Sequence, residues 1–226
     1  MIANQIVYED NHLLIINKKC GQLVQGDKTG DKSLLEEIKA FIKVRDHKPG
    51  NVFLGLVHRI DRPTSGLVIY AKTSKALSRL TQMVKNREVE KTYWAVVPKE
   101  IIPPEQKLVN YLRKNEKTNK ATVFDRPIEG AKEAKLFYKV IKYLENYLLL
   151  EINLETGRHH QIRAQLAKIK IPIKGDLKYG SPRSNSDGGI HLHARKLKLI
   201  HPVTKELLEV VAPTNPDDAI WKACEN

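Results

Sequence analysis

The chain has 226 residues, 41% of them hydrophobic, so it can bury a core of considerable size. Lysine and arginine number 39 against 26 aspartate and glutamate, and the formal charge of +13 favours a polyanionic partner, usually RNA or DNA. The charge alone does not distinguish a nucleic-acid-binding protein from a generally basic, soluble protein. The only cysteines are Cys20 and Cys224, a number and spacing that argue against a disulfide framework and a zinc site and indicate a reducing compartment.

The N-terminal sequence, M-I-A-N-Q-I-V-Y-E-D, lacks the basic region and apolar run of a signal peptide. No apolar stretch approaches the length of a membrane span. We therefore expect a cytoplasmic protein without a membrane partner, folded as a single domain over residues 1–226.

The first part of the sequence predicts short strands and amphipathic helices. Strands are expected at Gln5–Tyr8 and His12–Asn17, around a polar turn. A helix is expected after Ser33, because the spacing from Ser33 to Glu36 matches a capping box and an apolar stripe follows it. A second amphipathic helix is expected to begin with Ser74 as its cap.

The remaining sequence is richer in strands. An alternating strand is expected at Lys91–Val97, and a proline-rich loop at Pro98–Gln106. Further on we expect a strand and a polar turn within Lys107–Val123, and a hairpin of Ala134–Leu144 with Tyr147–Asn153. The segment Thr156–Arg163 is expected to open a helix that runs to about Lys168, with Ile162, Leu166 and Ile169 turned inward. Strands at Ile190–Ile200 and Glu206–Val211 and a short helix near Trp221 are expected to follow.

One segment, Gly55 to Lys72, places a carboxylate between two arginines. Its sequence is G-L-V-H-R-I-D-R-P-T-S-G-L-V-I-Y-A-K, in which Asp61 lies between Arg59 and Arg62. Neighbouring guanidinium groups favour the ionised form of a carboxyl group. The segment therefore predicts an anion at the mouth of a strand, among groups that can hold phosphate.

The histidines raise the possibility of a metal site, since His159-His160 and His191-x-His193 carry ligand atoms. Adjacent histidines rarely converge on one ion, and neither an H-E-x-x-H motif nor a cysteine pair accompanies them. We expect no functional metal. The glycines from Gly175 to Gly180 lack the spacing of a nucleotide-binding loop, so no cofactor is implied.

Four motifs in the same order resemble those of one enzyme family. The segment His58–Gly66, H-R-I-D-R-P-T-S-G, resembles the H-R-L-D-x-x-T-S-G signature of the RluA-type pseudouridine synthases. The others are Lys91-Thr92-Tyr93, the run Thr156–Arg163 continuing to Pro172–Gly180, and Leu192-His193-Ala194 with His201-Pro202. The similarity extends from about Ile6 to Pro213. It implies an α+β fold with a mixed, mainly antiparallel sheet, flanked by helices and loops around a catalytic cleft.

The resemblance implies an isomerase that breaks the bond from ribose C1′ to uracil N1 and joins C1′ to C5. It makes Asp61 the catalytic carboxylate, which stabilises positive charge on the sugar, bonds to C1′ or takes the C2′ proton. Arg163 is implied as its ion-pair partner, and a helix-surface arginine is the alternative. Tyr93 is implied to stack on the flipped uracil and to help remove the C5 proton, and core packing is the alternative.

Four further residues are expected to contact RNA. By resemblance Arg59 enters the RNA stack where the uridine leaves it, since a planar guanidinium both stacks and meets phosphate. Arg62 is expected at phosphate or in loop structure, and His58 orients the loop. Arg158 precedes a helix, where it meets phosphate or belongs to a polar cap region.

We therefore expect an RNA pseudouridine synthase acting on rRNA or tRNA, without a cofactor or an obligatory protein partner. The alternatives are a non-catalytic RNA-binding protein and a nucleic-acid glycosidase. Many relatives carry an S4-like RNA-binding domain, whereas here the catalytic domain is expected to begin within the first few residues. Target choice would then depend on the basic surface of this domain.

Overall fold

The computed structural model describes residues 1–26 and 30–226. It divides into two compact units, each made of two stretches of chain. Unit 1 comprises Met1–Glu90 and Ala194–Pro213, and unit 2 comprises Lys91–His193 and Thr214–Asn226. The expectation of a single domain stays a prediction, and each unit is described by itself.

Unit 1 is built around two apolar strands that are buried along nearly their whole length. The strand order is β1 (Ile6–Glu9), β2 (Leu13–Lys18), β4 (Ser65–Ala71) and β10 (Leu192–Ile200), with β3 (Gly55–Leu56) beside β4 and β11 (Leu207–Val211) beside β10. β2 and β4 pair antiparallel, with Ile15 opposite Ile69. Because side chains alternate between the faces of a strand, burial of consecutive residues means that both faces are covered.

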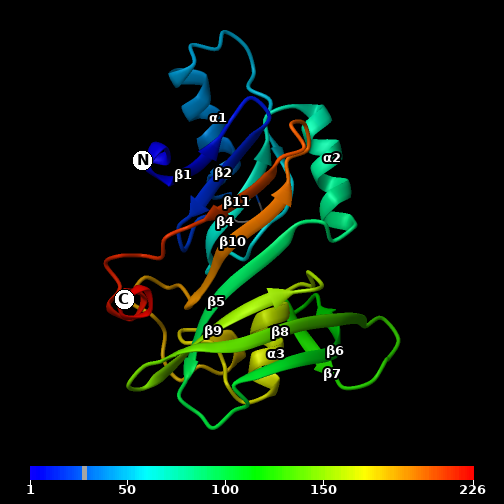
Figure 1. The fold of residues 1–226 in the computed structure, drawn as a ribbon, viewed down its shortest axis with the longest axis vertical. Coiled ribbons are helices and arrows are strands. Elements are labelled where there is room, and N and C mark those ends of the chain that lie inside the picture. Colours follow the sequence, from blue (N-terminus) through cyan, green and yellow to red (C-terminus); the bar gives the residue numbers. More distant parts are fainter. Residues whose placement is uncertain (27–29) are drawn as a thin grey trace. The chain divides into compact units, whose positions relative to one another are not determined.

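Two helices of unit 1 flank these strands (Figure 1). The short 3₁₀ helix η1 (Ile2–Gln5) lies at the start of the chain, before β1. The first α-helix, α1 (Leu34–Arg45), follows β2 and begins with the predicted capping box. Ser33 accepts the Glu36 N–H, and the Glu36 carboxylate accepts the Ser33 N–H. The second, α2 (Ser74–Lys85), packs against β3 and β4. The prediction that Ser74 caps α2 is wrong, because the Thr73 hydroxyl accepts the Ala76 N–H and Ser74 is the first helical residue.

Unit 2 contains an antiparallel array in the order β5-β9-β8-β6-β7. The strands are β5 (Glu90–Pro98), β6 (Glu105–Asn115), β7 (Lys120–Phe124), β8 (Lys132–Tyr143) and β9 (Tyr147–Leu154). The predicted hairpin of β8 and β9 is confirmed. β6 begins at Glu105, where a loop was expected, because the residues from Glu105 onwards pair with β8 despite the preceding prolines.

Three helices of unit 2 complete its packing. They are α3 (Gln161–Lys168), the 3₁₀ helix η2 (Leu177–Tyr179) and α4 (Ala219–Glu225). α3 packs against β6 and β7, with Ala164 in a small apolar cluster beside Leu112 and Ala121. In α4, Trp221 packs with Val96 of β5. The alanines let the backbone of α3 lie close to the strands, and this brings the side chains of α3 into the interior.

The observed elements confirm the predicted α+β fold with a mainly antiparallel sheet. The elements agree with the expected ones to within about two residues at most ends, which is the usual spread for helix and strand boundaries. Among the described helices, none has the length and apolar character needed to cross a bilayer.

Candidate active site

Asp61 lies in the loop that joins β3 to β4 in unit 1. The Thr64 N–H donates to the Asp61 carbonyl at 3.0 Å and closes a tight turn. The Gly21 N–H donates to the Arg62 carbonyl at 2.9 Å, which ties the turn to the segment after β2. The Asp61 side chain is half-buried. The carboxylate is therefore presented by a loop whose backbone is fixed at two points.

A buried lysine holds the same loop from beneath. Lys18, at the end of β2, is 0% exposed, and its ammonium group donates to the carbonyls of Lys19, Gln22 and Arg62, each at 3.0 Å. Burial lowers the pKa of Lys18 to about 8, and Asp61 is among the neighbouring charges that oppose this fall. This role could not be predicted from the sequence, since two adjacent lysines normally indicate a solvated turn.

Arg62 and Arg59 are both exposed but differ in their surroundings. The Arg62 side chain donates from Nε to the Gly21 carbonyl at 3.0 Å and pairs with Asp31 at 2.9 Å. These contacts give it a part in loop structure, one of its two expected roles. Contact of Arg62 or Arg59 with RNA stays a prediction.

His58 contacts the second half of β4. Its Nε2 accepts the Ile69 N–H at 3.2 Å, so that nitrogen carries a lone pair rather than a proton. The contact fastens the beginning of the Asp61 loop to the strand that follows it. This agrees with the expected orienting role, and contact of His58 with RNA stays a prediction.

Gly66 is required by the close approach of two strands behind the loop. Its φ is +108°, and a Cβ atom there would lie 2.4 Å from the backbone oxygen of Ala194 on β10. Only glycine fits that space and adopts that backbone conformation without strain. The Ser-Gly at the end of the H-R-I-D motif therefore allows β4 to pack against β10.

Tyr93 lies on β5 of unit 2, opposite Ile152 on β9, and is 8% exposed. Residues on both faces of β5 are buried, so burial alone does not separate Tyr93 from the core-packing alternative. Its stacking on uracil stays a prediction.

Arg163 is buried in the first turns of α3, which contradicts the helix-surface alternative. It is 5% exposed, whereas the residues of this helix expected to face inward were Ile162, Leu166 and Ile169. Its Nε and Nη2 donate to the two oxygens of Asp176 at 2.7 and 2.8 Å. The pairing of Arg163 with Asp61 joins residues of different units and stays a prediction.

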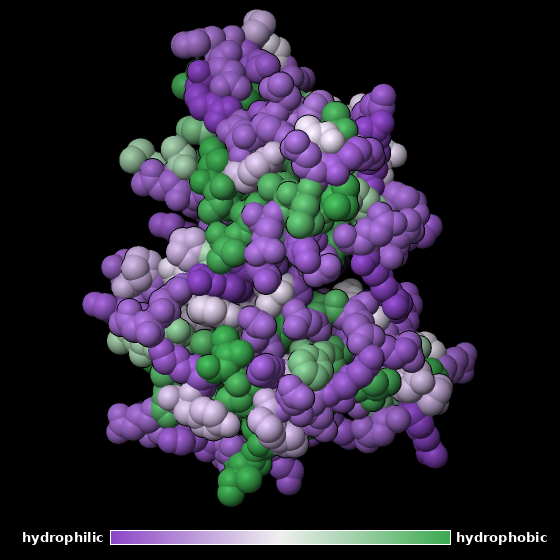
Figure 2. Space-filling view, viewed as in Figure 1, coloured by the Kyte–Doolittle hydropathy of each residue, from purple (hydrophilic) through white to green (hydrophobic). Residues whose placement is uncertain are grey.

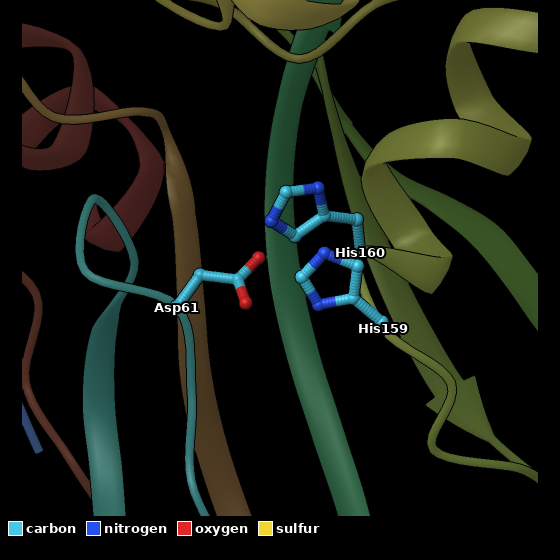
Figure 3. A group of neighbouring side chains, drawn as sticks. All are labelled: Asp61, His159 and His160. Carbon is cyan, nitrogen blue, oxygen red and sulfur yellow. The ribbon is translucent and has the colours of Figure 1, made fainter. Parts of the chain in front are cut away.

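His159 and His160 form a stacked pair just before α3, with ring centroids 3.8 Å apart. Figure 3 draws these two rings, together with the Asp61 side chain on its own loop. His160 has a left-handed backbone, with φ of 51°, and is the residue at which α3 begins. Burial first, and then the Arg163 charge, lower the pKa of His160 to about 2, so this ring is neutral at physiological pH.

A tyrosine connects His160 to the sheet. The Tyr179 hydroxyl accepts the Ala121 N–H at 2.7 Å and lies 2.9 Å from Nδ1 of His160. Because the hydroxyl accepts from the amide, its own proton is available to Nδ1, and this bond favours the neutral histidine. The Tyr179 ring also faces the Arg163 guanidinium, 5.1 Å from its centroid.

The turn before α3 is organised by Gln161 rather than by Arg158. The Gln161 side chain accepts from the Thr156 hydroxyl and the Arg158 N–H, and it donates to the Lys135 carbonyl. Arg158 donates from Nε to the Glu133 carbonyl at 2.9 Å. Its side chain therefore has a structural contact, and its contact with phosphate stays a prediction.

Both ring nitrogens of His191 have protein partners. Nδ1 lies 2.9 Å from the Asn185 amide nitrogen, and Nε2 lies 3.1 Å from the Asp218 carboxylate that caps α4. A histidine engaged in this way supports local structure rather than offering a lone pair to a metal ion.

Sequence reasoning missed three residues of the site: Lys18, Asp176 and Tyr179. Asp176 and Tyr179 lie in the run Pro172–Gly180. This run contained a usable signal, because it places an acidic and an aromatic residue shortly after the helix with Arg163. Unit 1 presents a pinned carboxylate, and unit 2 presents a buried tyrosine and a buried, charge-paired arginine.

Comparison with known proteins identifies the class to which this fold and these residues belong. Residues 12–168 match the RNA pseudouridylate synthase family. The chain is 32% identical to tRNA pseudouridine synthase C from Pectobacterium carotovorum, over 96% of this chain and 60% of that protein. It is 36% identical to ribosomal large subunit pseudouridine synthase C from Buchnera aphidicola, over 94% of this chain and 68% of that protein.

The chain therefore belongs to the RNA pseudouridylate synthase family, and the resemblance inferred from its motifs is confirmed. It spans less than two thirds of the length of the Pectobacterium relative. Among solved structures, human RNA pseudouridylate synthase domain containing 4 has the same fold, with a TM-score of 0.81 and 24% identity over 99% of this chain and 93% of that one.

Proposed function

We propose that this chain is an RNA pseudouridine synthase in which Asp61 is the catalytic carboxylate. The observation that carries the proposal is the family match that includes the H-R-I-D motif, with Asp61 on a loop pinned by Lys18. A fixed carboxylate beside a reacting sugar stabilises the positive charge that develops when the glycosidic bond breaks. Preorganisation of that kind is the contribution a rigid loop makes to catalysis.

The reaction needs one carboxylate rather than two. The C1′–N1 bond breaks, the detached uracil stays in the pocket, and C1′ joins C5, so no water has to be activated. Asp61 stabilises the sugar cation, bonds to C1′ or takes the C2′ proton, and all three roles require it to be ionised. In the proposed enzyme Arg163 supplies the charge that keeps it so, and Tyr93 stacks on the base.

The uridine must leave the RNA stack before it reaches the carboxylate. Extrusion costs a few kcal/mol, and a planar guanidinium that stacks in the vacated position offsets part of this. Arg59 is exposed on the Asp61 loop and is the residue proposed for that role. His58, Arg62 and Arg158 belong to the same proposal as residues near the RNA backbone.

The proposed substrate is structured RNA, either rRNA or tRNA, because the names of the two relatives include both kinds. Hydrophilic residues cover most of the face seen in Figure 2, in keeping with a formal charge of +13. A cytoplasmic location is part of the same proposal and is supported by the cysteine content, since two cysteines far apart in the sequence favour a reducing compartment.

The proposal is tested by tritium release from cellular RNA labelled at uridine C5. The wild-type chain should release tritium, and Asp61→Asn should release none, because an amide neither carries the charge nor attacks C1′. Asp217→Asn, which removes an exposed carboxylate, is the control and should be as active as wild type. Release that persists in Asp61→Asn would rule out the assigned role of Asp61.

The two alternative functions give different products in the same experiment. A nucleic-acid glycosidase would liberate free uracil, whereas the isomerase leaves the mass of the RNA unchanged. A non-catalytic RNA-binding protein would bind RNA equally well with Asp61→Ala and would change no uridine. Mass spectrometry of digested RNA distinguishes these outcomes.

A further inference from the structure

We propose that Asp176 is a positioning residue, which fixes the orientation of the Arg163 guanidinium for the reaction. The inference rests on the proposed function, because Arg163 is the residue assigned there to pair with the catalytic carboxylate. Asp176 itself is assigned no contact with substrate. Its effect on the reaction is exerted through Arg163.

The first support is the geometry of the pair. Asp176 receives two parallel hydrogen bonds from Arg163, at 2.7 and 2.8 Å, through Nε and Nη2. A bidentate contact of this kind fixes the plane and the direction of the guanidinium, which a single bond would leave free to rotate. The two side chains are 5% and 1% exposed, so water does not compete for these bonds.

The second support is the rigidity of the segment that carries Asp176. The Asp176 carbonyl accepts the N–H groups of Tyr179 and Ser181, both at 3.0 Å, and the Asp176 N–H donates to Ile173 at 3.0 Å. The preceding residue, Gly175, has φ of +87°, and a Cβ there would lie 2.6 Å from the Asn185 side chain. The carboxylate is thus held by backbone contacts independent of Arg163.

The third support is a second contact on the guanidinium. The Tyr179 ring faces Arg163 at 5.1 Å, and η2 carries Tyr179 three residues after Asp176. The short segment therefore supplies both an edge contact and a face contact to the same group.

A purely structural ion pair would show the same distances, so the test must separate the two roles. The variant Asp176→Asn keeps the size of the side chain but removes its charge and one acceptor. We expect kcat to fall by about a hundredfold with little change in KM for RNA, because a displaced catalytic group slows the chemical step rather than binding. Asp176→Glu keeps the charge and should recover part of kcat.

The decisive measurement is a double-mutant cycle with Arg163→Gln. If Asp176 acts through Arg163, Asp176→Asn should slow the reaction of the wild type but not that of Arg163→Gln. Glu9→Gln is the matched control, because Glu9 also accepts two hydrogen bonds from an arginine, Arg45, both at 2.7 Å, in unit 1. It should leave kcat unchanged.

Three results would overturn the proposal: wild-type kcat in Asp176→Asn, effects that multiply in the double variant, or a rise in KM alone. If Asp176→Asn does not fold, as judged by thermal unfolding, the same measurements on Asp176→Glu decide the question, and a wild-type kcat there contradicts the proposal. Failure of the proposed function is recognised separately, since it would appear as an inactive wild type or an active Asp61→Asn.

Discussion

At the scale of single residues, the Lys18 ammonium group is unusual because three backbone carbonyls enclose it. Each of its N–H groups has an acceptor, so its charge is solvated by the protein rather than by water. One of those acceptors belongs to Arg62, the neighbour of Asp61. The lysine thereby joins the end of β2 to the loop that carries the proposed catalytic carboxylate.

Replacing this lysine should damage both stability and activity. Lys18→Met keeps the length of the side chain but removes three hydrogen bonds to backbone carbonyls, and we expect the free energy of unfolding to fall by about 3 kcal/mol. Urea unfolding measures this change. Lys19→Met is the control, because Lys19 is exposed and should cost less than about 0.5 kcal/mol. If Lys18→Met and Lys19→Met lowered the free energy of unfolding equally, the hydrogen bonds of the Lys18 ammonium group would not be important for stability.

The neutral His160 should make the protein less stable in acid. Unfolded histidine binds a proton below about pH 6.5, whereas folded His160 has a pKa of about 2. Between these values the unfolded state holds the additional proton, so the free energy of unfolding should fall as the pH falls, by up to about 1.4 kcal/mol per pH unit.

The variant His160→Asn should make this pH dependence less steep, because asparagine tolerates a left-handed backbone and does not titrate. Denaturant unfolding between pH 4 and pH 7 measures the slope. His47→Asn is the matched control, since His47 also has a left-handed backbone, with φ of 49°, but is exposed. An unchanged slope in His160→Asn would show that another group is responsible.

The sequence indicates candidate site residues where their chemistry is local, and it does not indicate those whose role depends on distant partners. Asp61 could be selected because its arginine neighbours and its turn lie within a few positions of it. Asp176 could not, since its role depends on a contact with Arg163 that forms only when α3 and the segment before η2 come together. Lys18 was missed because the residues next to a lysine in the sequence do not indicate whether its side chain is buried.

At the scale of elements, the position of β4 against β10 depends on Gly66. Gly66→Ala would place a methyl group 2.4 Å from the Ala194 backbone oxygen, and neither strand can move without breaking its pairing. We expect the free energy of unfolding to fall by more than about 3 kcal/mol, which a denaturant titration would measure.

A substitution at Gly21 separates the two causes of the lower free energy of unfolding, which are the steric overlap and the left-handed backbone. Gly21 also has a positive φ, of +82°, but nothing lies within 4 Å of its Cβ position. Gly21→Ala should therefore cost only about 1 kcal/mol, the price of the left-handed backbone alone. A similar cost for both substitutions would mean that β10 yields to the added methyl group.

Elements with strong local signals were predicted correctly. The capping box of α1 and the apolar runs of β2 and β4 are properties of short segments. The cap of α2 was placed one residue late because Thr73 and Ser74 are chemically alike, and only the observed bond to Ala76 decides between them. Burial of α3 on several sides was not predictable from periodicity, since it depends on small residues in the facing strands.

At the scale of the whole molecule, the excess of positive charge should make RNA binding sensitive to salt. If about six phosphates are contacted, affinity should fall by roughly a thousandfold between 50 and 200 mM salt. Titration of labelled RNA at several salt concentrations measures the slope. A flat response would contradict an electrostatic contribution to binding.

The hairpin of β6 and β7 is a suitable place to test this charge, because it exposes five basic side chains. These are Lys107, Arg113, Lys114, Lys117 and Lys120. Lys117→Ala combined with Lys120→Ala should reduce the salt slope by about two if both lysines contact phosphate. Lys43→Ala with Lys48→Ala removes two exposed lysines, one in the last turn of α1 and one in the segment after it, and serves as the control.

The discontinuous units also set the order in which the nascent chain can fold. β4 is complete at Ala71, but its neighbour β10 begins only at Leu192. At about 10 residues per second, the ribosome leaves the part of that edge of β4 that β3 does not cover unpaired for on the order of ten seconds. An apolar strand with an open edge invites pairing with other chains, so synthesis is the stage at which this protein is most exposed to aggregation.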